Sequence, residues 1–254
     1  MMKWGRNIRN VTEAGAAAAA GFQWVQLPLS LIAGLSPREL EEAGRTLKDV
    51  GADFEVCLVD LPPEVRITQK GFNLYAWLEY MKKGIRGAAE LGCRTLAWCD
   101  GRARLLPVEG DTVRAKEQVM QFLFLAAEFG EKFGTRILVE PSDPRSSNFL
   151  NSLEEADAFF RRIGKENLGA VFNFGELYYP GREALDLLPF LDRVELVRLE
   201  FPDPETCADR GLPAGPIPLM NRFLEVLRTV SYRGRLLPSD SLPPEEIAGL
   251  RQSR

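Results

Sequence analysis

Eight short apolar runs alternate with longer amphipathic segments, and this alternation constrains the fold more than any other feature of the chain. The runs have the lengths of strands, which we predict at Lys3–Arg6, Trp24–Pro28, Asp53–Leu61, Thr95–Asp100, Ile137–Glu140, Gly169–Asn173, Glu195–Glu200 and Arg235–Pro238. Helices are predicted between them, at Val11–Ala20, Ser36–Val50, Tyr75–Leu91, Thr112–Phe133, Leu153–Ile163, Glu183–Leu191, Leu219–Val230 and Pro244–Leu250. Such alternation is typical of a parallel sheet. We therefore expect one α/β domain over residues 1–254, a (β/α)8 TIM barrel.

The amino-acid composition limits the kinds of molecule that we expect the protein to bind. With 254 residues, of which 45% are hydrophobic, the chain can bury one large core. Its net charge of −4 and pI near 5.2 argue against a nucleic-acid-binding surface. The N-terminus lacks the apolar core of a signal peptide, and the alanine run Ala16–Ala20 is too short to cross a bilayer. We expect a cytoplasmic protein that acts on small molecules and has no nucleic-acid or membrane partner.

The chain contains no histidine. This absence excludes Ser-His-Asp and Cys-His catalysis and any zinc site built on imidazole. The cysteines, Cys57, Cys93, Cys99 and Cys207, form no CxxC pair. They fit reduced, mostly buried thiols.

Two neighbouring predicted strands end in polar residues. Glu140 follows a buried run and precedes Pro141, and Asn173 ends the next strand. Between them, Ser152-Leu153-Glu154-Glu155 predicts a helix that begins with a capping box. The catalytic side chains of a β/α barrel stand at the carboxyl ends of its strands. Glu140 is therefore a candidate catalytic residue, with a structural cap or loop ion pair as the alternative.

The same stretch resembles a known family, the xylose isomerase-like TIM barrels. The resemblance rests on Val139-Glu140-Pro141, Asn148–Ser152 and Asn167-Leu168-Gly169. It extends over nearly the whole chain through Ala20–Pro28, Asp100–Arg104 with Pro107 and Gln118, and Tyr232-Arg233-Gly234. The family includes ketose 3-epimerases, hydroxypyruvate isomerases, inosose dehydratases and many proteins that are similar to sugar phosphate isomerases and epimerases.

The resemblance implies a divalent metal at the barrel floor, held by Glu, Asp, His and Glu from the last four strands. Matched by position, the ligands here are Glu140, Asn173, Arg198 and Ser239 with Asp240 beside it. The family's His three residues after the Asp becomes Glu176, and the Glu of its second strand becomes Gln26. Divalent cations need several oxygen donors, whereas a guanidinium offers no lone pair. We therefore expect no tightly bound metal and no other cofactor.

Arg198 is then expected to take the place of the ion, paired with Glu140 and with Glu200 as a further candidate partner. A guanidinium is planar, permanently charged and suited to a carboxylate or phosphate. The alternative is an ion bridge that fills a site without activity.

Several further arginines are predicted at the same end of the barrel: Arg6, Arg102, Arg104, Arg145 and Arg210. The segment Arg210-Gly211-Leu212-Pro213 resembles the family's loop arginine that touches substrate. Taken singly, each is more often a solvated loop residue. Converging on one mouth, they would attract a small anionic sugar such as a sugar phosphate or sugar acid.

Together these residues predict an isomerase- or epimerase-like enzyme. Glu140 would act as the acid/base, and Arg198 would stabilise an enediolate without a metal. A second carboxylate is needed for two-base transfer, with Glu176, Glu200 and Asp240 as candidates, while Gln26, Arg102, Arg104, Asn173, Glu200, Arg210 and Asp240 would bind substrate. A non-catalytic binding barrel and a metal-free lyase or dehydratase remain alternatives. The apurinic-site endonuclease function found on this fold is not expected, because it rests on His-bound zinc. A homo-oligomer is possible.

Overall fold

The structure is a computed structural model that describes residues 2–144, 146–178, 183–201 and 216–252. Its strands are β1 (Lys3–Asn7), β2 (Trp24–Pro28), β3 (Asp53–Leu58), β4 (Thr95–Trp98), β5 (Arg136–Val139), β6 (Leu168–Asn173), β7 (Val194–Leu199) and β8 (Arg235–Pro238). They pair in parallel and in chain order, and β8 pairs with β1 to close the barrel. The predicted (β/α)8 TIM barrel is confirmed.

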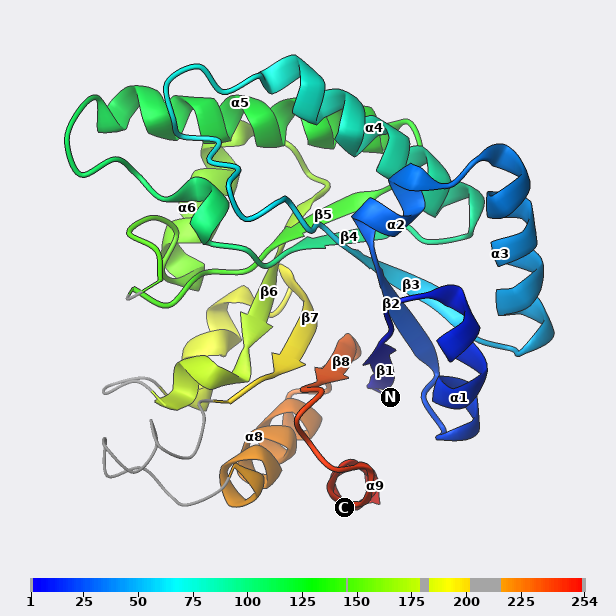
Figure 1. Ribbon diagram of the computed structural model, residues 1–254. Coiled ribbons are helices and arrows are strands. Elements are labelled where there is room, and N and C mark those ends of the chain that lie inside the picture. The colour runs from blue at the N-terminus through cyan, green and yellow to red at the C-terminus, as the bar shows by residue number, and fades with distance from the viewer. Residues whose placement is uncertain (1, 145, 179–182, 202–215, 253–254) are drawn as a thin grey trace.

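Helices surround the strands (Figure 1). They are α1 (Ala14–Ala19), α2 (Leu29–Gly34), α3 (Pro37–Asp49), α4 (Leu74–Glu90), α5 (Thr112–Glu131), α6 (Leu153–Ile163), α8 (Ile217–Thr229) and α9 (Pro244–Gln252). The described residues also form four 3-10 segments: η1 (Val11–Glu13), η2 (Arg102–Arg104), η3 (Phe174–Tyr178) and η4 (Ala184–Phe190). Two predicted helices differ. The first divides into η1 and α1, and the helix predicted at Glu183–Leu191 is the 3-10 segment η4, which contains Pro189.

The short helix α2 is an addition that the sequence pattern does not predict. It follows β2 directly and lacks a side-chain cap. Its Leu29 and Ile32 are buried against α4. A Cβ on Gly84 would lie 2.1 Å from Leu29, and one on Gly87 would lie 2.8 Å from Ile32. These two glycines therefore permit the close approach of the two helices.

A tryptophan fills the middle of the barrel. Trp24 is fully buried and packs inside the barrel with Val56, Ala97, Leu138, Val171, Leu196 and Leu237. A Cβ on Gly5 of the neighbouring strand β1 would lie 2.2 Å from the Trp24 ring, so this position needs glycine. These side chains form a solid floor, in the layered manner of TIM barrels.

Charged side chains close the barrel below that floor. Near the first residues of their strands, Lys3 and Arg235 each contact a different carboxylate oxygen of Glu55, both at 2.6 Å. Arg136 pairs with Glu195 in the same region. These charged side chains at the amino-terminal end of the barrel are therefore paired with one another.

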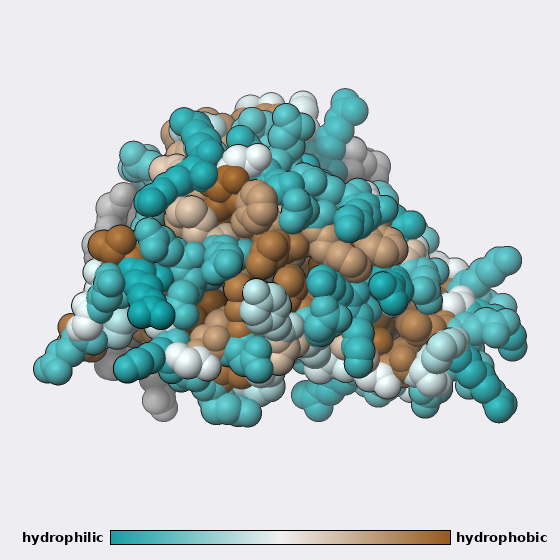
Figure 2. All heavy atoms as spheres, turned by 90° about the horizontal axis from the view of Figure 1, so that it is seen from above, coloured by the Kyte–Doolittle hydropathy of each residue, from teal (hydrophilic) through white to brown (hydrophobic). Residues whose placement is uncertain are grey.

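The surface is mainly polar on the face that lies uppermost in Figure 1, although apolar side chains are exposed in a band between the polar ones (Figure 2). Tyr75, Val108 and Val113 are the most exposed large apolar side chains among the described residues. Among those residues, no helix combines the length and the apolarity that a membrane span requires.

Candidate functional site

The polar side chains of the mouth point inward because each lies two positions after a member of the floor. Successive side chains of a strand alternate between its two faces. Leu138, Val171 and Leu196 belong to the floor cluster. The residues two positions later, Glu140, Asn173 and Arg198, therefore stand one layer above it, and Asn173 and Arg198 are register partners.

Glu140, Asn173 and Arg198 form one connected network with Glu200, and we call these four residues the ion-pair set. The two carboxylate oxygens of Glu140 accept hydrogen bonds from Asn173 Nδ2 at 2.8 Å and from Arg198 Nη1 at 2.7 Å. Arg198 Nη2 donates to Glu200 at 3.0 Å. The amide oxygen of Asn173 accepts from the backbone N–H of Gly175 at 2.9 Å. Arg198 thus bridges two carboxylates, the neighbours that we expected for it.

Burial differs sharply along this set. The Glu140 side chain is 7% exposed and Arg198 is 22% exposed, whereas Glu200 is 36% exposed. Burial disfavours the charged form of Arg198, but Glu140, Cys99 and Glu200 outweigh it and hold its pKa well above the ordinary value. The guanidinium is therefore a permanent positive charge inside the mouth.

Cys99, which follows β4, lies beside this set. Burial and the neighbouring Glu140 carboxylate raise the pKa of its thiol well above the ordinary value. From the sequence we expected only a reduced, buried thiol here. Its place near the site could have been found from the sequence, because Cys99 comes one residue after an apolar run, as Glu140 does after β5.

The described residues do not fit a divalent metal at this place. Of the positions matched to the family's ligands, Glu140 keeps a carboxylate, but both of its oxygens are engaged by Asn173 and Arg198. Arg198 brings a cation to within 2.7 Å of the carboxylate that would bind the ion. Among the described residues, no group of three Cys, Asp or Glu side chains could hold a metal.

Arg104 does not reach the mouth, where we expected it to bind substrate. It is fully buried under the loops after β4 and β5. Its guanidinium donates to the carbonyl oxygens of Glu140 and Phe149 and, at 2.6 Å, to Ser142 Oγ. Burial lowers its pKa to about 10, so it is protonated at neutral pH. Arg104 therefore fixes the loop that carries Glu140.

The asparagines of the family-like motif also hold the loop together. Asn148 exchanges two hydrogen bonds with the backbone of Leu106, and Asn151 Nδ2 donates to the carbonyls of Ser142 and Ser147, both at 2.8 Å. Asn151 N–H in turn donates to Glu155. Both asparagines therefore hold the loop between β5 and α6 in place.

Two more of the arginines predicted at the mouth, Arg6 and Arg102, have carboxylate partners. Arg102 contacts Asp100 at 3.0 Å. Arg6 lies 3.7 Å from Asp240, which also accepts a hydrogen bond from Asn7 Nδ2 at 3.0 Å. Arg145 and Arg210 lie outside the described residues. Of the arginines predicted at the mouth, Arg6, Arg102 and Arg198 are therefore paired with carboxylates.

Gln26 is a buried amide at the same level of the barrel. It lies two positions after Trp24 on β2 and pairs in register with Asn7 of β1. It is 2% exposed, and its Nε2 has no hydrogen-bond partner among the described residues. An amide donor left in this way is a candidate for contact with a polar ligand.

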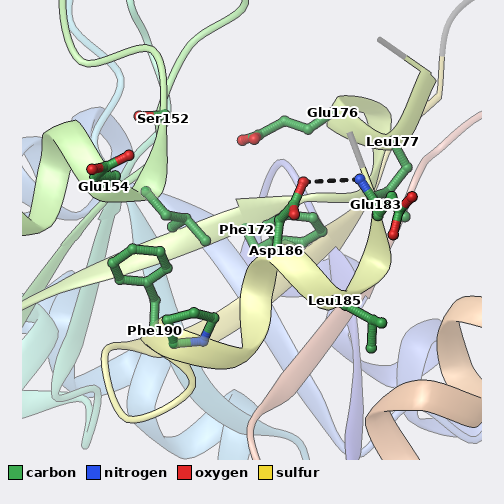
Figure 3. A pocket seen from close by; sticks show the side chains of 11 residues that line it. Ser152, Glu154, Phe172, Glu176, Leu177, Glu183, Leu185, Asp186 and Phe190 are labelled. Atoms are coloured by element: carbon green, nitrogen blue, oxygen red, sulfur yellow. Dashed lines mark hydrogen bonds between the residues drawn. The ribbon is translucent and has the colours of Figure 1, made fainter. Parts of the chain in front are cut away.

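Glu176 is separated from the ion-pair set. It lines a cavity of ≈ 500 Å³ that lies between the start of α6, η3 and η4, together with Glu154, Glu183 and Asp186 (Figure 3). Neither Glu140 nor Arg198 lines this cavity. Glu176 therefore faces a cavity that Glu140, its predicted partner in two-base transfer, does not line.

Comparisons with known proteins agree with this architecture. A family model described as xylose isomerase-like TIM barrel matches residues 14–247. Among solved structures, 3-keto-D-glucoside 4-epimerase from E. coli is 16% identical over 99% of both chains, with a TM-score of 0.79.

Two further structures are similar. D-psicose 3-epimerase from Clostridium cellulolyticum H10, solved with D-tagatose, is 11% identical over 100% of this chain and 90% of its own, with a TM-score of 0.77. D-allulose 3-epimerase from Methylomonas sp., in complex with D-allulose, is 14% identical over 99% and 89%, with a TM-score of 0.70. At such identities the likeness establishes the fold. No curated protein matches the sequence significantly.

Proposed function

Because the chain belongs to the xylose isomerase-like TIM barrel family, we propose that it binds an uncharged sugar in the barrel mouth and moves a proton next to the sugar's carbonyl without a resident metal. The solved neighbours include epimerases of free sugars. The observation that carries the proposal is the guanidinium of Arg198, which bridges Glu140 and Glu200. A fixed cation of this kind supports the negative charge of an enediolate.

The uncharged substrate class follows from the pairing of charges. We expected a small anionic sugar, drawn in by converging arginines. Arg6, Arg102 and Arg198 instead contact carboxylates, and Arg104 is buried under the loops. A phosphate or carboxylate ligand would have to displace the carboxylates from these arginines. The hydroxyl groups of a sugar can instead hydrogen-bond to the same carboxylates and guanidinium groups while the ion pairs stay intact.

A second candidate is sugar binding without catalysis. It is favoured by Glu140, whose buried carboxylate has a donor on each oxygen. To accept a proton from a sugar, this carboxylate would have to release one of these two donors. For both candidates we propose that Glu140 anchors Arg198, in place of the acid/base role predicted from the sequence.

Binding and proton exchange test the proposal together. Calorimetric titrations with D-fructose, D-allulose and D-fructose 6-phosphate measure affinity, and NMR in D2O measures loss of the sugars' C–H signals. Each exchange reaction is run with EDTA and, in parallel, with added Mn²⁺. We expect the uncharged sugars to bind more tightly than the phosphate ester, and exchange to continue in EDTA.

A pair of variants controls the experiment. Arg198→Met removes the bridging cation, and Arg38→Met removes an arginine from an exposed ion pair on α3. We expect exchange to be lost only in the first. Exchange that requires Mn²⁺ would refute the metal-free proposal, and binding without exchange would support the second candidate.

A further inference from the structure

The geometry points to Glu200 as the single working base of the site, and therefore to a one-base aldose–ketose isomerisation in place of an epimerisation. This inference rests on the proposed function. It concerns which carboxylate accepts the proton and which reaction one such carboxylate can complete.

Glu140 is unsuited to accept the proton. Its two oxygens are engaged by Asn173 and Arg198, and its side chain is 7% exposed. To take a proton from a sugar, it would have to break one of these contacts inside the barrel. Its contacts instead orient the Arg198 guanidinium.

Glu200 has the opposite properties. It lies just past the end of β7, two positions after Arg198 on the inward face, and its side chain is 36% exposed. One oxygen accepts from Arg198 Nη2, and the other accepts no hydrogen bond from the described residues. An accessible carboxylate beside a fixed cation can take a proton while that cation holds the resulting oxyanion.

Four other carboxylates near the mouth either have hydrogen-bond or ion-pair partners of their own or line a different cavity. Asp240 contacts Arg6 and accepts from Asn7. Asp60 accepts hydrogen bonds from the backbone and side chain of Ser30 and from the Tyr80 hydroxyl, so it ties together the segments that follow β2 and β3. Asp100 pairs with Arg102, and Glu176 lines a different cavity. Among the described residues, Glu200 stands alone as an available base at the ion-pair set.

The number of bases limits the reaction. Epimerisation inverts a carbon, so one group removes the proton and another delivers it to the opposite face. Aldose–ketose isomerisation moves a proton between adjacent carbons on one face, which a single carboxylate can do.

For a ketose, Glu200 takes a proton from C1, and the C–H electron pair forms the C1=C2 bond of an enediolate. The carbonyl pair moves to O2, where the remaining N–H groups of Arg198 stabilise it. The hydroxyl proton then passes from O1 to O2, the electron pair on O1 forms the C1=O bond, and the C1=C2 pair takes the proton back from Glu200 at C2. The product is the aldose, and the step needs no oxidant, reductant or metal.

The test is the position of exchange in D-fructose. The full chain is incubated with D-fructose in D2O and EDTA, and NMR follows deuterium at C1 and C3 together with the appearance of aldoses. We expect deuterium at C1, formation of aldose and no label at C3. Glu200→Gln should reduce the exchange rate by ~100-fold or more, the usual contribution of a general base, with D-fructose affinity within ~3-fold of wild type, because the amide keeps the shape of the side chain.

Two comparisons make the result specific. Glu195→Gln carries the same substitution on the same strand but at the closed end of the barrel, and it should retain exchange. Glu140→Gln should retain more exchange than Glu200→Gln.

Label at C3, formation of D-allulose, or an active Glu200→Gln would overturn the inference while leaving the proposed function standing. Loss of D-fructose binding in Glu200→Gln would also overturn the assignment of Glu200 as base. Absence of exchange in the wild-type chain would overturn both proposals.

Discussion

Removing the Arg198 side chain should destabilise the fold, because it leaves the carboxylate of Glu140 buried without its cation. Breaking one partner of a buried ion pair costs about 3–5 kcal/mol. The Arg198 side chain is 22% exposed, and Asn173 still donates to Glu140. We therefore expect the lower end of that range for Arg198→Met, about 3 kcal/mol. In a domain of this size that loss lowers Tm by ~6–12 °C.

A double-mutant cycle assigns the loss to the buried charge. Glu140→Gln in the Arg198→Met background removes the carboxylate, so it should recover at least ~1 kcal/mol of the loss. The matched control is the pair Arg38–Glu42 on α3, whose side chains are 87% and 53% exposed. Arg38→Met should change stability by only ~0.5 kcal/mol.

Urea unfolding followed by circular dichroism, together with thermal melts, measures wild type, Arg198→Met, Glu140→Gln, their double variant and Arg38→Met at pH 7. A wild-type stability for Arg198→Met would refute the buried ion pair as the anchor of the site. A double variant no more stable than Arg198→Met would show that the loss does not come from the charge of Glu140.

Two further predictions concern the neighbours of this ion pair. Arg104→Met removes the donors that hold the carbonyls of Glu140 and Phe149 and the hydroxyl of Ser142. Since each buried group left without a partner costs ~1–3 kcal/mol, urea unfolding should report a free energy of unfolding lower by at least ~3 kcal/mol. An unchanged unfolding midpoint would contradict the structural role of Arg104. The raised pKa of Cys99 keeps its thiolate scarce at pH 7, so peptide mapping by mass spectrometry should find slow alkylation by iodoacetamide that accelerates as pH rises, and alkylation as fast as that of an exposed cysteine would contradict it.

The barrel could be predicted because its signals are local. Apolar runs of strand length recur between segments of helical period, and the bounds predicted for the second and eighth strands are those of β2 and β8. The errors fall where local signals are weak or contradicted. The six residues of α2 are too few to show a helical period, and Pro189 interrupts the hydrogen bonding that an α-helix would need in η4.

The site could be predicted only in part. Glu140, Asn173 and Arg198 lie in or next to strands, where alternation fixes the direction of each side chain, and the structure brings them together. The loop residues lack such a rule. Whether Arg104 turns under the loop or toward solvent depends on the turn η2 and on carbonyls distant in sequence. The same applies to Glu176, whose 3-10 segment η3 directs it to a separate cavity.

The solid floor formed by Trp24 and its neighbours has a consequence for molecular traffic. With the other end blocked, whatever enters the mouth must leave by the same opening, so departure of one molecule has to precede arrival of the next. For the proposed reaction, the turnover rate would then depend on how quickly product dissociates through this single opening. Substitutions in the surrounding loops would change that dissociation rate without changing the chemical step.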